Sequence, residues 1–406
     1  MNLNHFVDPN IPSSGDFEIV EKKGRGHPDT LADRLAERLS VAYSIFTKEE
    51  TGVILRHQFD KLLLMGGRCD VSFGSGTFNS PVRVVFNGRM TRRIGEKEIH
   101  FHDQLLKECR LFLEGELRNF KFSTDCRIIY ETTSHSTRGL VDSTGRFPIN
   151  YRFSPRNIND LPESGRPLAN DTALGYGFAP YSGLEKLIVE IEHLLTSDNF
   201  RNQHMWIGSD IKIMGCRIKN DVEITIAIPQ ICTEVNSASE YAANIQKLQV
   251  IVDRIARQYE GFATKIMINP SDNLSEQIMY LRYTGSCIES GDEGAVARGN
   301  RIGGVISACR SYTIEGLNGK NPAYHAGKLY SAVAWEIANE VYKETNIPCE
   351  VFVLSQIDRP LDDPWKIIIS YAQKIDEAIA VSIVEKMLSN IKDITQKLLL
   401  GLYPLC

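Results

Sequence analysis

The chain has 406 residues, of which 42% are hydrophobic and 24% are charged. This composition is that of an ordinary globular protein, and it excludes a disordered, collagen-like or coiled-coil chain. Lysine and arginine number 46 against 51 aspartates and glutamates, which gives a formal net charge of −5. Because no overall basic field is available, we expect neither nucleic acid nor a membrane surface as a partner.

Residues 1–20 lack the basic stretch and apolar core of a signal peptide, and the apolar runs of the chain are too short to span a bilayer. We therefore expect a cytoplasmic protein. The nine cysteines include no Cys-x-x-Cys pair. This spacing favours reduced thiols in small apolar sites over disulfides or a cysteine zinc site.

Hydrophobic periodicity predicts helices and strands in mixed order. In chain order we expect a helix at 31–44, strands at 82–86 and 126–131, a helix at 184–195, a hairpin at 211–228, a helix at 241–259, a strand at 277–284, a helix at 323–342, a strand at 350–356 and a helix at 372–399. Residues 132–171 are rich in Ser, Arg, Asn, Pro and Gly and predict a long surface loop. Hairpins mixed with helices indicate an α+β fold, and the strict alternation of a doubly wound sheet is missing.

The first motif with chemical meaning is Gly24-Arg25-Gly26-His27-Pro28-Asp29, directly before the first predicted helix. Proline is favoured at the first helical position, so the motif predicts a glycine turn that delivers a helix N-terminus beside His27. Free N–H groups at such an end bind anions, and Asp29 is a candidate for a cation that accompanies the anion. The alternative is an ordinary helix start with His27 as its cap.

The second motif spans residues 291–304, where five glycines stand with two carboxylates and two arginines. Glycines let the backbone approach a ligand closely, arginines grip phosphate oxygens, and carboxylates hold Mg²⁺. Asp292, Arg298 and Arg301 are the candidates of this span. A solvated loop is the alternative, but Ile302 and the apolar residues that follow it favour a loop drawn toward the core.

The third motif runs from Gly316 to Lys328 and leads into the predicted helix at 323–342. Lys320 and Lys328 flank this helix start with His325 between them, which is a second place for a polyanion. The spacing is not that of a Walker A loop. The chain also lacks a Gly-x-Ser-x-Gly elbow, a His-Glu-x-x-His motif and a kinase His-Arg-Asp loop.

Further polar residues recur near glycines and strand ends. They are His57, Asp60, Lys61, Asn170, Asp171, Asp210 and Lys212. Each alone is better explained as a structural charge, because surface pairs are common. His100 and His102 are likewise better explained as an exposed pair than as metal ligands.

Taken together, these motifs resemble the archaeal-type methionine adenosyltransferases, or S-adenosylmethionine synthetases. The resemblance runs from about residue 18 to residue 364. Its carriers are Gly26-His27-Pro28-Asp29, His57 with Asp60, Gly66-Gly67, residues 73–76, 169–172 with 175–180, 210–215, Gly291-Asp292 with 298–301, 319–322 with His325, Gly327-Lys328, Gln356-Ile357 and Arg359-Pro360.

The resemblance implies one compact catalytic unit of three α/β subdomains, interleaved in sequence around a pseudo-threefold axis, with approximate segments 1–135, 136–285 and 286–406. It implies a homodimer whose sheets pack face to face, with active sites at the interface. It also implies the reaction, in which the methionine sulfur attacks C5′ of ATP and the released triphosphate is hydrolysed to pyrophosphate and phosphate. Mg²⁺ is the expected cofactor, with K⁺ as a further candidate.

The resemblance also implies roles for individual residues. His27, Lys320, Arg301 and Lys212 are the catalytic candidates, with His27 facing the oxygen at C5′ or the adjoining phosphate. ATP and its phosphates would contact Gly26, Arg298, Gly299, Asn300, Lys328, His325 and Asp171, and Mg²⁺ would bind Asp29 and Asp292. Asp210, Asp60 and Phe178 are the candidates for substrate binding. Asp171 or Asp210 would hold the ribose hydroxyls or the methionine amino group, and Phe178 would stack on adenine or belong to the core.

The chain departs from the family pattern at several positions. Family members usually have glycine at Ala297, asparagine at Gly303, a third glycine at Ser75 and a small or apolar residue at Arg25. Residues 135–140 replace a family signature that contains a carboxylate. These departures keep open a diverged paralogue that uses a methionine analogue, a hydrolase of ATP or triphosphate, and a nucleotide-binding regulatory subunit without activity.

Overall fold

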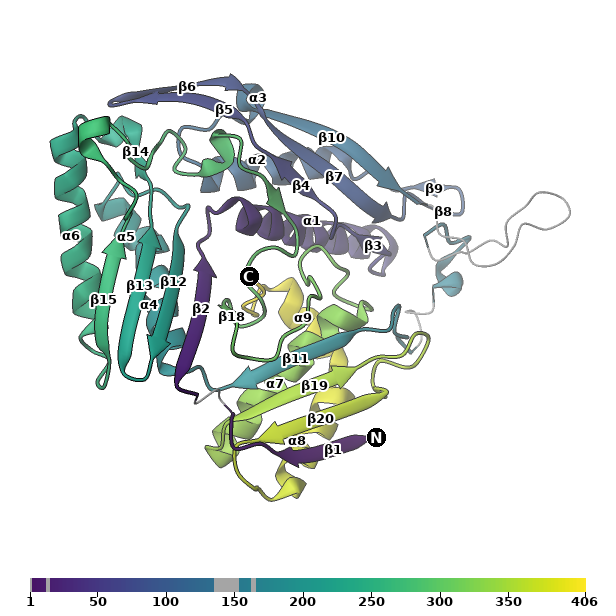
Figure 1. Ribbon diagram of the computed structural model, residues 1–406. Coiled ribbons are helices and arrows are strands. Elements are labelled where there is room, and N and C mark those ends of the chain that lie inside the picture. Colours follow the sequence, from purple (N-terminus) through teal and green to yellow (C-terminus); the bar gives the residue numbers. More distant parts are fainter. Residues whose placement is uncertain (1, 12–14, 135–152, 162–165) are drawn as a thin grey trace, which may run out of the picture.

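The computed structural model describes residues 2–11, 15–134, 153–161 and 166–406. Three sheets, each with helices packed against one face, make up most of this part of the chain (Figure 1). The fold is therefore a mixed α+β fold, as the sequence predicts. The altered segment at 135–140 and most of the expected loop at 132–171 lie outside the described residues. In the described part of the chain, no helix has both the length and the apolar character needed to cross a bilayer.

The first unit runs from β2 to β10. Its elements are β2 Phe17–Lys23, α1 Pro28–Thr51, β3 His57–Gln58, β4 Leu63–Met65, β5 Arg68–Ser72, β6 Ser75–Ser80, β7 Val82–Met90, β8 Arg93–Ile94, β9 Lys97–Glu98, α2 His102–Glu116, α3 Phe122–Asp125 and β10 Cys126–Thr133. Its sheet has the order β10-β7-β4-β17. Leu31, Leu35 and Leu39 recur every fourth residue on α1, and all three are fully buried against this sheet.

The second unit runs from β11 to β16. Its elements are β11 Leu174–Ala179, α4 Gly183–Thr196, α5 Asp198–Gln203, β12 Lys212–Ile218, β13 Asp221–Ala227, β14 Gln230–Ile231, α6 Ala238–Ala256, β15 Ala263–Ile268 and β16 Leu281–Arg282. Its sheet has the order β15-β13-β12-β2-β18. The β12–β13 pair is the predicted hairpin, and Ile213, Ile224 and Ile226 are fully buried in the core under α4 and α6.

The third unit comprises β17 Gly294–Ala295, β18 Ile306–Ser307, α7 Ala326–Thr345, β19 Cys349–Leu354, β20 Lys366–Tyr371, α8 Glu377–Ser389 and α9 Ile391–Leu399. Its sheet has the order β1-β20-β19-β11, with β1 Leu3–Val7 as one edge. Short 3₁₀ turns lie at Ile158–Asp160, Cys232–Glu234, Leu274–Glu276 and Cys287–Glu289. The helix α7 is buried at the centre of the largest apolar cluster.

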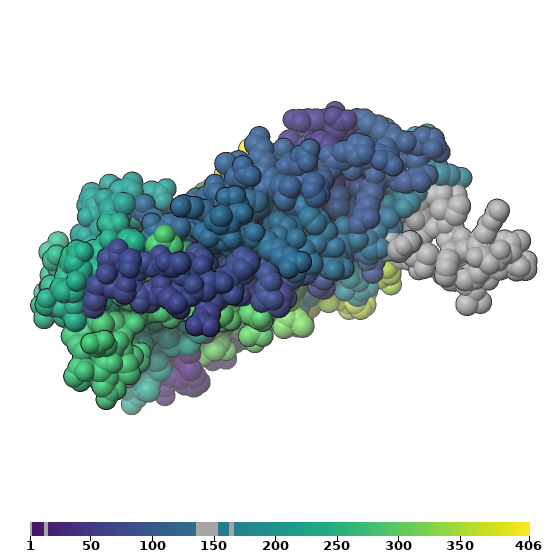
Figure 2. All heavy atoms as spheres, turned by 90° about the horizontal axis from the view of Figure 1, so that it is seen from above, coloured from purple at the N-terminus to yellow at the C-terminus, as the bar shows by residue number. Residues whose placement is uncertain are grey.

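Each unit contributes at least one strand to the sheet of another unit. The strand β2, which precedes α1, pairs with β12; β11, which precedes α4, pairs with β19; and β17, which precedes α7, pairs with β4. The hairpin β5–β6 also reaches out of its unit, because Gly74 N donates to Cys232 O at 2.8 Å. Figure 2 shows this hairpin in dark blue, lying along the surface toward the green second unit. The three units are therefore held together by strand exchange.

Two expected elements differ from the structure. The predicted strand at 277–284 is wrong over most of its length, since only Leu281–Arg282 pair as β16 and Gln277 caps a 3₁₀ turn with φ of 58°. The predicted helix at 372–399 is two helices, α8 and α9, which break at Asn390. The other predicted elements are confirmed: their ends differ by at most four residues, except that α1 runs to Thr51, seven residues beyond the predicted end.

Candidate active site

The glycine turn before α1 is attached to the chain that leads into β12. Gly24 N donates to Ile211 O at 2.6 Å, and Gly26 N donates to Ser209 O at 2.9 Å. A Cβ on Gly26 would lie 2.0 Å from Ser209 Oγ, so only glycine fits at this position. The predicted turn is confirmed, and it delivers the N-terminus of α1 beside His27.

His27 is the N-cap of α1, and its Nδ1 accepts a hydrogen bond from Asp29 N at 3.2 Å. Burial, together with the positive charges of Lys23 and Lys212, lowers the pKa of His27 to about 4, against the opposing effect of Asp29 and Asp292. The imidazole is therefore neutral at pH 7. Because Nδ1 accepts, the proton resides on Nε2, which is available as a donor to an oxygen of a ligand.

The two predicted metal ligands, Asp29 and Asp292, differ in exposure. Asp29 is buried, and its Oδ2 lies 2.9 Å from Lys23 Nζ while its Oδ1 accepts from Ala295 N at 3.1 Å. Asp292 is exposed and its charge acts on His27. The carboxylate of Asp29 thus already faces a cationic group, whereas Asp292 Oδ1 accepts from Glu293 N at 3.1 Å.

A row of three carboxylates on α1 organises the glycine-rich loops, and the sequence analysis missed two of them. Asp29, Asp33 and Glu37 recur every fourth residue and so lie on one face of the helix. Asp33 accepts from Ala297 N at 2.8 Å and from Gly299 N at 3.0 Å, and Glu37 accepts from Gly319 N at 3.0 Å. The signal in the sequence that could have identified them is the recurrence of acidic residues at every fourth position of the predicted helix.

The loop at 291–304 is bound to β2 and α1 rather than solvated. Asn300 Oδ1 accepts from Lys23 N at 2.9 Å, and Asn300 Nδ2 donates to Lys23 O at 2.8 Å. Arg301 Nη1 donates to Ala297 O at 2.9 Å. Arg298 is exposed, and its carbonyl oxygen accepts from Lys23 Nζ at 2.6 Å. The loop that carries Arg298 and Arg301 is therefore attached to β2 and to α1.

A second cluster of cations lies at the start of α7. Lys320 is 7% exposed, forms an ion pair with Glu315 and lies 3.8 Å from Asp60 Oδ2. Lys328 is fully buried, and its Nζ lies 2.5 and 2.6 Å from the two oxygens of Glu37. The row of acids on α1 thus connects this cluster to His27.

His325 is the N-cap of α7 and lies between the two lysines in sequence. It is buried, and its Nδ1 has no hydrogen-bond partner in the described chain. Burial and the charges of Lys320 and Lys328 hold its pKa well below the ordinary range. A buried polar atom without a partner costs free energy, so Nδ1 of His325 is a candidate contact for a ligand atom.

Comparison with known proteins shows the family of this chain. A model of the S-adenosylmethionine synthetase (AdoMet synthetase) family matches residues 6–402. The chain belongs to this family. Among similar members, a probable S-adenosylmethionine synthase of Aquifex aeolicus is 37% identical over 351 residues, which cover 86% of this chain and 84% of the relative. The S-adenosylmethionine synthase of Pyrococcus furiosus is 34% identical over 392 residues, which cover 94% and 93%.

The fold is also similar to that of a solved structure described as an unusual S-adenosylmethionine synthetase from Campylobacter jejuni. The TM-score is 0.54 at 12% sequence identity, and the match covers 93% of this chain and 88% of the other. This likeness concerns the fold alone.

The remaining predicted residues of this synthetase lie in three different settings. Asp210 is buried near the His27 turn, its Oδ2 accepts from Cys287 N at 2.7 Å, and burial, with the nearby charge of Asp292, raises its pKa to about 7. Asp171 is exposed, and its Oδ1 accepts from Thr172 N at 2.8 Å. Lys212 is exposed and lies 3.4 Å from Glu21 Oε1.

Phe178 of β11 lies in the apolar core, not on an open surface. It is 3% exposed, the ring of Trp335 meets it edge-on at 5.3 Å, and Arg310 Cζ lies 4.1 Å from its centroid. These neighbours cover the ring in the present arrangement. Among the two roles considered for Phe178, this packing favours the core aromatic.

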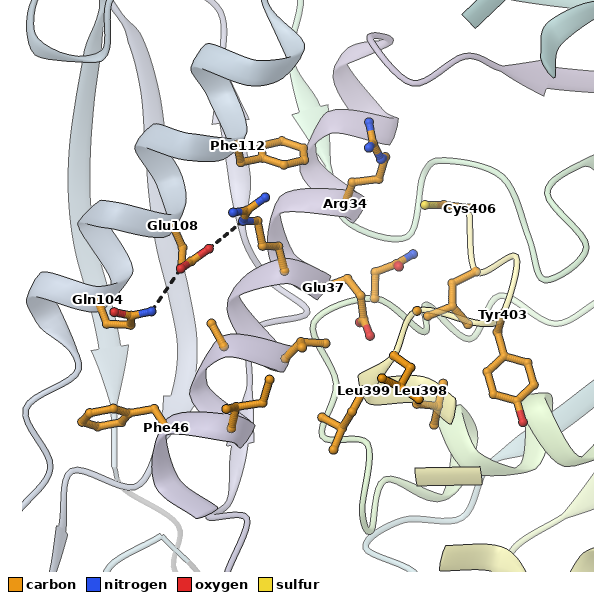
Figure 3. A pocket seen from close by; sticks show the side chains of 18 of the residues that line it. Arg34, Glu37, Phe46, Gln104, Glu108, Phe112, Leu398, Leu399, Tyr403 and Cys406 are labelled. Carbon is orange, nitrogen blue, oxygen red and sulfur yellow. Dashed lines mark hydrogen bonds and ion pairs between the residues drawn. The ribbon is translucent and has the colours of Figure 1, made fainter. Parts of the chain in front are cut away.

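A cavity of about 770 Å³ lies between α1, α2 and the segment after α9 (Figure 3). On its α1–α2 wall, Arg38 Nε contacts Glu108 Oε2 at 2.7 Å, and Gln104 Nε2 donates to Glu108 Oε1 at 3.0 Å. Glu37 also lines the cavity. The cavity therefore borders the polar cluster through Glu37, while its described lining includes none of the predicted site residues.

Proposed function

We propose that this chain is an S-adenosylmethionine synthase, which joins the adenosyl group of ATP to the sulfur of methionine and hydrolyses the released triphosphate to pyrophosphate and phosphate. The observation that carries the proposal is His27 as the N-cap of α1, with Asp29 Oδ2 at 4.0 Å from its Nδ1 and Lys23 Nζ at 2.9 Å from the same carboxylate oxygen. Family membership and the names of the relatives support the same activity.

This reaction requires groups that position the substrates and neutralise the charge of the triphosphate, rather than a group that removes a proton. A thioether is a nucleophile without loss of a proton, so no general base is required. The transition state requires the sulfur in line with C5′ and the leaving oxygen. It also requires stabilisation of the charge that develops on the leaving triphosphate. His27 Nε2 is a donor suited to the oxygen that leaves C5′. It would act without changing its protonation state.

The triphosphate would bind at the cations around the acidic row of α1. Lys320, Lys328, Arg298 and Arg301 are the side chains proposed for this role, with His325 as a further donor and with Gly26, Gly299 and Asn300 shaping the backbone around it. Lys320 and Lys328 are paired with carboxylates in the present arrangement. Binding of the triphosphate would thus exchange one anionic partner for another, which avoids leaving a buried cation unpaired.

The family implies a divalent metal cofactor, and the carboxylates near His27 fit Mg²⁺. Mg²⁺ in phosphoryl sites keeps several waters and uses one or two carboxylates together with phosphate oxygens. Asp29 and Asp292 supply such a pair, and no group of three or more His, Cys, Asp or Glu side chains forms a cage in the described chain. When bound, the ion would neutralise charge on the phosphates. K⁺ is a further candidate without assigned ligands.

The methionine and ribose contacts are proposed for acidic residues near this centre. Asp210 and Asp171 are candidates for the ribose hydroxyls or the amino group, and Asp60 is a candidate for substrate contact beside Lys320. Lys212 would assist at the phosphates, because its charge already acts on His27. Phe178 would reach adenine only after its covering residues move.

The repeated order of elements supports a pseudo-threefold arrangement of three interleaved subdomains. Each unit has the order strand, helix, hairpin, helix, and gives its first strand to another unit's sheet. The proposed segments 1–135, 136–285 and 286–406 each contain one such unit. Exposed apolar residues on the open face of the second sheet, Met214 and Met267, suit the proposed homodimer with sheets face to face. A cytoplasmic location remains a prediction.

The proposal is tested by incubating the purified protein with ATP, Mg²⁺ and methionine and identifying the products by mass spectrometry. We expect S-adenosylmethionine in step with phosphate and pyrophosphate, and neither without methionine. Phosphate release that does not depend on methionine would instead indicate the hydrolase. Lys320→Ala should lower turnover by about 10²-fold or more, whereas Lys343→Ala, on an exposed face of α7, should leave it unchanged.

A further inference from the structure

Arg25 stands inside the glycine turn, at a position where the family resemblance leads us to expect a small or apolar residue. Its guanidinium makes two parallel contacts with Glu116, from Nε to Oε2 at 2.8 Å and from Nη2 to Oε1 at 2.9 Å. The third nitrogen, Nη1, lies 3.1 Å from Asp198 Oδ1 and 3.4 Å from Thr196 O. The side chain therefore joins the turn to the end of α2 and to the junction of α4 and α5.

These contacts close a ring around the turn. Glu116 O accepts a hydrogen bond from Ser209 Oγ at 3.4 Å, and Ser209 O accepts from Gly26 N at 2.9 Å. Arg34, on the second turn of α1, approaches Glu116 from its other side at 2.8 Å and donates to Arg25 O at 3.4 Å. The residue that precedes His27 is thus held through the backbone on one side and through Arg25 and Glu116 on the other.

We propose that Arg25 is a positioning residue, which fixes the Gly24–Gly26 turn so that His27 keeps its orientation toward the reacting end of ATP. This inference rests on the proposed function, because it assigns His27 to the chemical step. Bidentate pairs of arginine and carboxylate are the most directional ion pairs in proteins. A small misplacement of a group that acts on the reacting atoms costs rate rather than binding.

Another ion pair in the same helix pair provides a matched control. Arg38 Nε contacts Glu108 Oε2 at 2.7 Å, so it also joins α1 to α2. It lies on the cavity wall three turns from His27 and does not touch the glycine turn. Replacing either arginine by alanine removes one positive charge and an ion pair with α2, and Arg25→Ala also removes the contacts with Thr196 and Asp198. Only the Arg25 variant releases the turn.

The test compares Arg25→Ala, Arg25→Lys and Arg38→Ala with the full-length wild type. It measures kcat, the KM for methionine and for ATP, thermal unfolding, and the imidazole resonances of His27 at one fixed pH. We expect Arg25→Ala to lose at least about 10-fold in kcat with KM changed by less than about 2-fold, and to shift the His27 signal. Arg25→Lys keeps the positive charge but cannot make the two parallel contacts with Glu116. Its kcat should therefore lie between those of Arg25→Ala and the wild type. Arg38→Ala should lower the unfolding temperature but leave kcat, both KM values and the His27 resonances unchanged.

Two results would overturn the inference. One is a kcat for Arg25→Ala within about 2-fold of Arg38→Ala, and the other is an unshifted His27 signal. If Arg25→Ala does not fold, the same comparison is made with Arg25→Lys, and a wild-type kcat and His27 signal in that variant would contradict the role. A wild type that forms no S-adenosylmethionine would contradict the proposed function, while the His27 resonances would still report on the position of the turn.

Discussion

Lys328 Nζ lies 2.5 and 2.6 Å from the two carboxylate oxygens of Glu37, which joins the first turn of α7 to the third turn of α1. Lys328 is fully buried and also donates to Lys320 O at 2.9 Å. Burial lowers the pKa of Lys328, and the charge of Glu37 opposes this effect. A cation that we propose as a ligand of the triphosphate is thereby kept charged inside the protein when no polyanion is bound.

Removing this partner should destabilise the protein strongly. In Glu37→Gln the ammonium of Lys328 remains buried without a counter-charge, so we expect the free energy of unfolding to fall by about 3–5 kcal/mol. Chemical denaturation at pH 7 measures the change. Glu49→Gln, on an exposed position near the end of α1, is the control and should change stability by less than about 0.5 kcal/mol. Equal stability of the two variants would show that the pair is unimportant.

The Glu116 carboxylate predicts a pH dependence of stability. Burial alone would raise its pKa, but hydrogen bonds and charges from Arg25 and Arg34 outweigh burial and lower the pKa to about 2, from an ordinary value of 4.5. A lowered pKa means that this stabilisation is fully present above pH 4.5 and is lost as the pH falls toward 2. The difference in unfolding free energy between wild type and Glu116→Gln should therefore shrink over that range. A difference independent of pH would contradict this assignment.

Gly26 tests whether the close contact of the turn matters for the reaction. A Cβ at this position would meet Ser209 Oγ, Cβ and backbone carbon within 2.6 Å, so the turn must move in Gly26→Ala. We expect a loss of about 10²-fold in kcat. Gly115→Ala in α2, where a Cβ would meet nothing within 4 Å, should raise stability by about 0.5–1 kcal/mol and leave kcat unchanged. Equal rates for the two variants would contradict the fixed turn.

Ala297 occupies a backbone conformation that suits glycine. Its φ is 71°, in the left-handed region, where a Cβ costs about 1–2 kcal/mol. Ala297→Gly should remove this strain and, after the entropy that glycine adds to the unfolded chain, raise stability by up to about 1 kcal/mol. Ala243→Gly, on an exposed position of α6, should lower stability by about 1 kcal/mol. Chemical denaturation of both variants measures whether each substitution raises or lowers the free energy of unfolding. A lower free energy of unfolding in Ala297→Gly would contradict the proposed backbone strain.

Local patterns predict the elements of this fold better than their pairing. The β12–β13 hairpin is evident from alternating apolar residues, and α1 from leucines at every fourth position. Nothing in the sequence near β2 indicates that it pairs with β12, about 190 residues later, because strand pairing depends on the packing of distant segments. The break at Asn390 is likewise not predicted, because apolar periodicity continues across it.

The sequence predicts the motifs of the site but not the contacts that hold them. His27, Asp29 and the residues around Lys320 are recognisable because glycine, proline and charge occur together. Asp33 and Glu37 escaped notice because their partners are backbone N–H groups of loops more than 250 residues away. A carboxylate that binds backbone carries no local signature beyond its spacing on the helix.

The central claim is tested most directly with ATP that carries ¹⁸O at the oxygen bridging C5′ and the α-phosphorus. Attack of the methionine sulfur on C5′ breaks the carbon–oxygen bond, so we predict S-adenosylmethionine with all of the label in the phosphate products. Mass spectrometry of one incubation with Mg²⁺ and methionine measures both. Label retained in ADP or AMP, with phosphate released and no S-adenosylmethionine formed, would contradict the account.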